Sequence, residues 1–228
     1  MIKKSKTEVE YRLAKWLFRN LEDQHYILPD EVQAIWQSLI KYYEPPTACL
    51  EIICGTFGCN ENLFKGRVFC GNCGNYYTVR PWHTKQRVWV CRESGKTGHV
   101  CRNTHIHDYA FRYQLKEIML LLLKKHKDVI NICERLLRAY VKNEPRKQSA
   151  IDYLRDIQKV SPNDLTEGAE IMFMTGRITV FPENTMEVDI VDGKKVRWSL
   201  KPYSPSRGWW RSCTGYMRDG RKNRDDSR

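Results

Sequence analysis

The sequence predicts an α+β fold in which helices flank a small cysteine-rich β-ribbon. Three observations carry this prediction: apolar residues recur at helical spacing on both sides of the ribbon, the ribbon is rich in glycine, and short β-type runs follow near the C-terminus. We expect five parts in chain order: a helical segment over 1–53, the β-ribbon over 54–105, a short coiled-coil-like helical hairpin over 106–160, a β-meander over 168–202 packing on the ribbon and helices, and a disordered basic tail over 203–228.

The N-terminal segment carries two runs at helical spacing. They are Val9, Leu13, Trp16 and Leu17, followed by Val32, Ile35, Trp36, Leu39 and Ile40. Pro29, followed directly by two acidic residues, is typical of a helix start. The prolines of "EPP" at 44–46 end the second helix, because proline has no N–H donor and restricts the residue before it.

The stretch 54–104 differs from its flanks. It contains seven glycines, and its apolar pieces are the short runs "RVF", "YYTVR" and "RVWVC". Runs of β-branched and aromatic residues between glycines predict short strands joined by tight turns.

The helical period returns after Ile106. Val129, Cys133, Leu136 and Tyr140 form one stripe, and a further helix is expected after Pro145. Three β-type runs then follow, "RITVF", "MEVDIV" and "KVRWSL". The last two are separated by Asp-Gly at 192–193, which favours a type I′ hairpin because glycine accepts a positive φ.

Nothing in the sequence predicts a membrane span or a secretory signal. The longest apolar run, "IMLLLL" at 118–123, is far shorter than the roughly 20 residues that a spanning helix needs. The N-terminal "MIKKSKTEVEYR" has no apolar core. We therefore expect a cytoplasmic protein without a membrane partner, whose nine cysteines are thiols or metal ligands instead of disulfides.

The charge predicts a polyanionic partner. The formal net charge is +12, and it is clustered: residues 194–228 hold eleven Lys/Arg against three acids, and residues 80–102 hold six against one. A basic surface of this kind is typical of nucleic-acid binding, with an acidic membrane surface as the second candidate and a generic basic surface as the plain alternative.

Four cysteines have a spacing that suits zinc. Cys70-x2-Cys73 is followed by seventeen residues, Cys91, nine residues and Cys101. Thiolates two residues apart can both reach one metal ion at about 2.3 Å, and Gly71 and Gly74 permit the turn. We expect one structural zinc ion, since four protein ligands leave no open position for water or for a small-molecule substrate.

Other roles for these cysteines remain open at this point. Cys70–Cys73 alone could be a redox dithiol, although such a pair usually lies where a strand meets a helix, or two buried thiols. His99 or His105 could replace Cys101 as a ligand. The group Cys49, Cys54 and Cys59 has no common zinc spacing and is interpreted as buried or incidental thiols, and Cys133 as a core residue.

The stretch "LFKGRVFCGNCGNYYTVRPWHTKQRVWVCRESGKTGHVCRNTHI" resembles the zinc β-ribbon of large serine recombinases, the phage integrases and transposon resolvases. The family pattern places a "(F/L)xGxxxCGxCG" knuckle before "(Y/W)xC" and "CxNxxI". The matching residues are Gly66, Cys70, Gly71, Cys73, Gly74, Trp89, Cys91, Cys101, Asn103 and Ile106. Looser matches, "QHYILPDEVQAIWQSL" and "GRITVFPENTMEVDI", extend the resemblance over roughly residues 25–192.

This resemblance implies a DNA-binding function without catalysis. The family's catalytic domain would precede the ribbon, and Ser5 does not lie in the "YxRvS" strand that its nucleophile needs. The family's long coiled coil after the ribbon is also shortened. We therefore expect no strand cleavage by this chain alone, and a separate recombinase catalytic subunit as a candidate partner.

The expected ligand is double-stranded DNA at a recombination or transposition site. Candidate phosphate contacts around the ribbon are Arg67, Arg80, Lys85, Arg87 and Arg92. The tail "SRGWWR" at 206–211 mixes cations with aromatic residues, as in nonspecific nucleic-acid contacts. The alternative hypothesis is a zinc-ribbon interaction protein that binds a partner such as a recombinase through its helices without touching DNA.

Overall fold

The structure is a computed structural model, and it describes residues 2–43, 64–82, 86–95, 101–165, 175–190 and 193–200. The predicted disordered tail over 203–228 lies outside these residues, as do Cys49, Cys54 and Cys59. The predictions made for those positions therefore stay predictions.

The described residues form five α-helices and seven strands. The helices are α1 (Ile2–Asp23), α2 (Pro29–Tyr43), α4 (Asp108–Lys125), α5 (Asp128–Tyr140) and α6 (Glu144–Asp156). The strands are β1 (Val68–Cys70), β2 (Tyr77–Trp82), β3 (Gln86–Cys91), β4 (Ile106–His107), β5 (Thr175–Phe181), β6 (Thr185–Ile190) and β7 (Lys195–Ser199). The α+β class and the order of helices and strands are confirmed.

The strands form two sheets. β2, β3 and β4 make a three-stranded antiparallel sheet, and the other four strands lie in the order β1-β5-β6-β7. β5, β6 and β7 are antiparallel as expected, and Gly193 in the β6–β7 turn has a φ of +80°. One feature was not predicted: β1, from the ribbon, pairs in parallel with β5, with Cys70 opposite Val180. The ribbon therefore supplies an edge strand to the C-terminal sheet.

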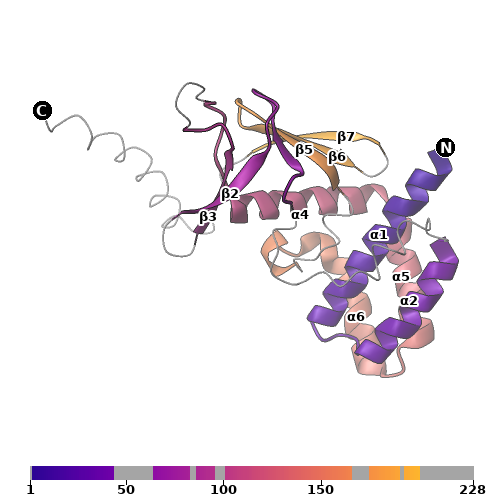
Figure 1. The fold of residues 1–228 in the computed structure, drawn as a ribbon. Coiled ribbons are helices and arrows are strands. Elements are labelled where there is room, and N and C mark those ends of the chain that lie inside the picture. The colour runs from indigo at the N-terminus through magenta and orange to yellow at the C-terminus, as the bar shows by residue number, and fades with distance from the viewer. Residues whose placement is uncertain are drawn as a thin grey trace, which may run out of the picture.

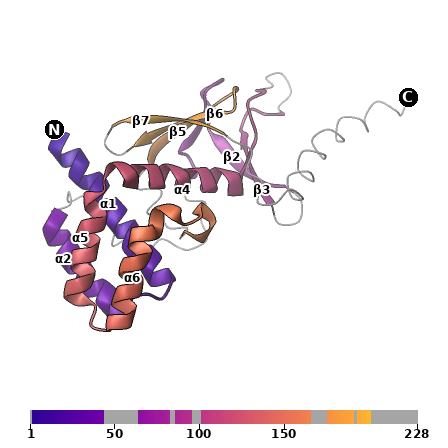
Figure 2. The same cartoon turned by 180° about the vertical axis from the view of Figure 1, so that it is seen from behind.

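The helices are arranged as a bundle with one long helix beside it. α1, α2, α5 and α6 pack on one another, while α4 runs between this bundle and the two sheets (Figures 1 and 2). The segment 106–160, expected as a short helical hairpin with a further helix after Pro145, contains α4, α5 and α6. The apolar stripe of α5, with Val129, Cys133 and Leu137 buried, is covered by α1 and α2 as well as by α6.

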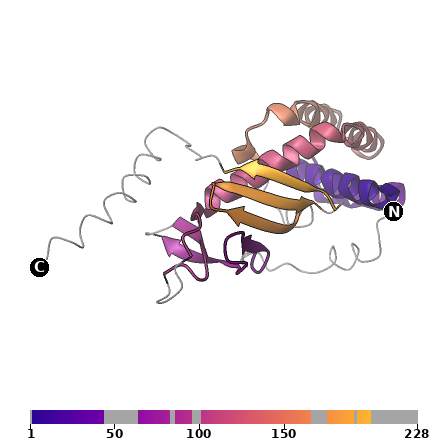
Figure 3. The ribbon, with the colours of Figure 1, turned by 90° about the horizontal axis from the view of Figure 1, so that it is seen from above.

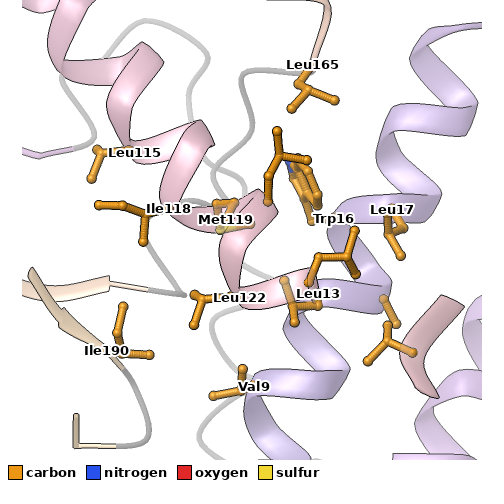
Figure 4. Packing of buried hydrophobic residues seen from close by; sticks show 14 of the residues in the cluster. Val9, Leu13, Trp16, Leu17, Leu115, Ile118, Met119, Leu122, Leu165 and Ile190 are labelled. Carbon is orange, nitrogen blue, oxygen red and sulfur yellow. The ribbon is translucent and has the colours of Figure 1, made fainter. Parts of the chain in front are cut away.

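One continuous core joins these layers. In Figure 4, Leu13 and Trp16 of α1 lie near Met119 and Leu122 of α4, and Ile190 of β6 reaches the same region from the sheet. α4 is apolar around most of its circumference because it meets the bundle on one side and the strands on the other. In the part of the chain that the structure describes, no helix combines the length and hydropathy needed to cross a membrane.

Candidate metal centre

Four cysteines from different parts of the ribbon converge at one point. Cys70 ends β1, Cys73 lies in the turn after it, Cys91 ends β3, and Cys101 precedes β4. The Sγ atoms of Cys70 and Cys101 are 3.5 Å apart, and those of Cys73 and Cys91 are 3.4 Å apart. All four sulfur atoms lie within 4.8 Å of one another, so the spacing in the sequence is brought together in space.

Each half of the cluster is a tight turn built around a glycine. In the first turn the Gly74 N–H donates to the Cys70 carbonyl at 2.9 Å, and Gly74 has a φ of +74°. In the second the Ser94 N–H donates to the Cys91 carbonyl at 2.9 Å, and Gly95 has a φ of +80°. Only glycine takes these backbone angles without strain, so both turns can close around the sulfur atoms.

The donor set fits zinc. Sulfur separations of 3.4 and 3.5 Å are far from the roughly 2.05 Å of a disulfide and close to the about 3.8 Å between ligands of a tetrahedral ZnS₄ site. Burial, followed by the neighbouring sulfur atoms, raises the pKa of the Cys91 thiol. A divalent cation supplies the positive charge that four crowded thiolates need. The cluster is a structural zinc site, and the expected cofactor is confirmed.

Asn103 supports the cluster from behind. Its side-chain amide donates to the Cys70 Sγ at 3.0 Å and to the Val180 carbonyl at 2.7 Å, and its Oδ1 accepts the Thr104 N–H at 2.8 Å. Burial opposes ionisation of the Cys70 thiol, but the hydrogen bonds from Asn103 and from backbone N–H groups outweigh it and lower the pKa of Cys70 to about 7. Asn103 therefore favours the thiolate that binds metal.

The first turn also contacts the C-terminal sheet. The Gly71 N–H donates to the Val180 carbonyl at 2.7 Å, where β5 continues past the end of β1. A Cβ at Gly71 would lie 2.7 Å from Cε1 of Phe181 and 3.0 Å from the Val180 oxygen. Unlike Gly74, Gly71 has no positive φ; glycine is required here because β5 approaches so closely.

We expect Gly71→Ala to destabilise the protein by about 1–3 kcal/mol, since the Phe181 ring or the β5 backbone must move to make room. Gly176→Ala in β5 is the matched control, because its Cβ would meet nothing closer than 3.4 Å. Gly176→Ala should be neutral or slightly stabilising. Urea unfolding of the zinc-loaded variants measures both changes, and equal free energies of unfolding for the two would contradict the packing argument.

Aromatic residues fix the ribbon to α4. Trp89 of β3 is fully buried, its ring centroid lies 5.3 Å from that of Phe111 on α4, and its Nε1 donates to Asp108 at 2.7 Å. Phe64 lies against both rings, with centroids 6.4 Å from Trp89 and 5.2 Å from Phe111. Tyr77 is also buried and donates to the Thr104 carbonyl, so these aromatic side chains support the ribbon from within.

Four of the predicted basic residues are described, and they lie on three parts of the ribbon. Arg80 and Arg87 lie exposed on the β2–β3 hairpin, and Arg92 in the second turn donates to the Tyr76 hydroxyl at 2.5 Å and stacks over its ring. Arg67 lies apart from them, exposed just before β1. Lys85 lies outside the described residues.

Residues 63–116 match the family model described as the recombinase zinc beta ribbon domain. Over this segment the chain is similar to that domain. The resemblance stated from the sequence is thereby confirmed over these residues, while its wider extent over 25–192 stays a prediction. Neither a curated protein nor a solved structure matches the chain.

The residues of the metal cluster resolve one alternative, the identity of the fourth ligand. Cys101 contributes its sulfur to the cluster, whereas His105 lies outside it, with its Nε2 3.2 Å from the Ser94 hydroxyl. His99 falls outside the described residues. The role of Asn103 was not predicted: the residue stood in the motif, but spacing alone does not reveal that its amide contacts both a sulfur atom and β5.

Proposed function

We propose that this chain binds duplex DNA at a recombination or transposition site through its zinc ribbon and does not cleave the strands by itself. The observation that carries the proposal is the recombinase zinc ribbon over residues 63–116, with Arg80 and Arg87 exposed on its hairpin. Within the described part of the chain neither arginine forms an ion pair, so both guanidinium groups are available to phosphate.

The physical basis of the proposal is a rigid, basic hairpin. The zinc cluster closes one end of β2 and β3, and the aromatic contacts to α4 hold the hairpin in place. The hairpin therefore loses little conformational freedom when it binds DNA. A net charge of +12 favours association with a polyanion. A separate recombinase subunit that supplies catalysis, and a reducing cytoplasmic location that keeps the thiolates intact, are parts of the same proposal.

We expect the zinc-loaded chain to bind a fluorescent 30-base-pair duplex of random sequence at low salt, with affinity that falls steeply between 50 and 200 mM salt. In the double variant Arg80→Gln and Arg87→Gln, the negative slope of log K against log salt should become shallower by about 1.8, because two phosphate contacts are lost at about 0.9 each. Fluorescence anisotropy over a salt series gives both slopes.

The matched control is Lys41→Gln with Lys142→Gln, which removes the same charge from exposed positions on the helical bundle. This control should keep the wild-type slope. If the wild-type chain retains no duplex at 50 mM salt, or if both double variants weaken binding equally, the ribbon is not the DNA contact.

A second candidate function has one specific observation behind it. Tyr42 of α2 and Tyr140 of α5 are exposed large side chains, and each is held in place: Ser38 bonds to Tyr140, and Arg135 donates to the Tyr42 hydroxyl at 2.9 Å. Tyrosine and arginine are enriched at protein interfaces. If the bundle binds a partner such as a recombinase, Tyr42→Ala with Tyr140→Ala should abolish that complex and leave duplex binding unchanged.

A further inference from the structure

The outer face of the β1-β5-β6-β7 sheet is uncovered in the described part of the chain. Its inner face is apolar and buried against the core, with Ile178, Val180, Met186 and Val188 at full burial. Seen from above in Figure 3, the strands lie over α4, and no described helix crosses their other side. Alternation along the strands places the intervening residues on this open face.

Two arginines on the open face stack on aromatic rings. The Arg177 guanidinium carbon lies 3.9 Å from the ring centroid of Phe69, and that of Arg197 lies 5.6 Å from the centroid of Phe181. Both arginines are exposed. Phe69 comes from β1 of the ribbon, so the Arg177–Phe69 pair exists only because the ribbon strand joins this sheet, whereas Phe181 and Arg197 both belong to the C-terminal strands.

Glu187 and Asp189 on this face share the ammonium group of Lys195 instead of pairing with either arginine. Glu187 lies opposite Arg197 in the strand register, but its carboxylate accepts from Lys195 at 2.6 Å, and Asp189 lies 3.7 Å from the same ammonium group. Neither Arg177 nor Arg197 forms an ion pair or hydrogen bond within the described residues. Their guanidinium N–H groups are therefore available to an anion from outside.

Stacking on the rings preorganises the Arg177 and Arg197 guanidinium groups for binding phosphate. A guanidinium lying over a ring keeps its edges free, and those edges carry paired N–H donors that match two phosphate oxygens. The ring restricts the side chain beforehand, so less rotational freedom is lost on binding. Arg177 and Arg197 are two strands apart, roughly 10 Å across the sheet at about 4.8 Å per strand, and thus reach two different phosphates.

We infer that this sheet face is a second contact surface for the phosphate backbone of duplex DNA, with Arg177 and Arg197 as the anion-binding groups and Arg67 beside them. The inference rests on the proposed function, because it takes the same duplex as the ribbon hairpin. The Gly71 and Asn103 hydrogen bonds to Val180 hold the sheet against the zinc cluster, so the two surfaces keep a fixed offset.

The test uses the full zinc-loaded chain with Arg177→Gln and Arg197→Gln and the 30-base-pair duplex of random sequence. We expect affinity to fall at least about tenfold at 100 mM salt and the negative log–log salt slope to become shallower by about 1.8. Arg177→Lys with Arg197→Lys keeps the charge and loses the flat, paired donors, so it should restore most of the slope but only part of the affinity. Zinc content and circular dichroism confirm that each variant is folded.

The outcomes show whether this inference fails alone or together with the proposed function. If the sheet variant binds duplex with the wild-type slope while Arg80→Gln with Arg87→Gln does not, the second surface is wrong and the ribbon function stands. A sheet variant weakened only toward a 30-nucleotide single strand also overturns it. If Lys41→Gln with Lys142→Gln makes the slope shallower by as much as the sheet variant does, the loss of affinity reflects net charge alone and the inference fails. If the wild-type chain binds no duplex, both the sheet-face inference and the proposed ribbon function are wrong.

Discussion

Replacing Cys91 by serine is expected to release the zinc ion and to unfold both the ribbon and the C-terminal sheet. The cluster links three separate segments, at the ends of β1 and β3 and before β4. A ribbon of this size has little core of its own, and zinc binding contributes roughly 10–16 kcal/mol in small zinc domains. Losing one of four ligands should therefore remove most of the free energy that keeps the ribbon folded.

The effect should pass into the C-terminal sheet because β1 is one of its edges. Once the ribbon unfolds, β5 loses its pairing with β1 and the hydrogen bonds that Gly71 and Asn103 make to Val180. α1, α2, α5 and α6 cover one another and should keep their helical signal. Metal analysis together with amide hydrogen exchange measures this: exchange should accelerate at Ile178 and Val188 but not in α5.

Cys133→Ala is the matched control for this prediction. Cys133 is completely buried in the bundle and lies outside the metal cluster, so its loss should leave one equivalent of zinc bound. If Cys91→Ser keeps more than half an equivalent of zinc, the cluster does not depend on that ligand. If zinc leaves and β5 stays protected from exchange, the sheet is stable without the ribbon.

Much of the ribbon could be predicted because its signals are local. The Cys70-x2-Cys73 spacing, the glycines and the alternating β-type runs determine turns and strands within a few residues, and the structure places β2 and β3 where these runs lie. The zinc site could be predicted because four thiolates at this spacing are a ligand set that zinc prefers. The ribbon motif is likewise contained within the matched segment 63–116.

What the sequence did not reveal depends on contacts between distant segments. The pairing of β1 with β5 joins residues more than a hundred positions apart, and no local pattern specifies a parallel edge strand. The stacking of Arg177 on Phe69 follows from that pairing and was missed for the same reason. The packing of the helices over 106–160 could not be predicted either, because periodicity shows that α5 has an apolar stripe but not which helices cover it.

Replacing Asn103 by leucine tests whether the zinc cluster and β5 are stabilised by one side chain. Leucine keeps the branching and the number of side-chain heavy atoms, but the Cys70 sulfur loses a donor at 3.0 Å and the Thr104 N–H loses its acceptor at 2.8 Å. The Val180 carbonyl keeps the Gly71 N–H. We expect the free energy of unfolding to decrease by about 2–3 kcal/mol and zinc affinity to decrease by about 10–100-fold.

Asn103→Asp should bind zinc more weakly still. The carboxylate can accept the Thr104 N–H as asparagine does, but its second oxygen replaces the donor that faces Cys70 and Val180 and adds a negative charge beside the thiolates. Thr104→Val is the control, since among the described residues its hydroxyl bonds only to Pro182 and Asn184, and its loss should cost less than about 1 kcal/mol. Chelator competition ranks the variants. If Asn103→Leu holds zinc as tightly as the wild type, the role of Asn103 is limited to stabilising β5, and the thiolates bind zinc without help from its amide.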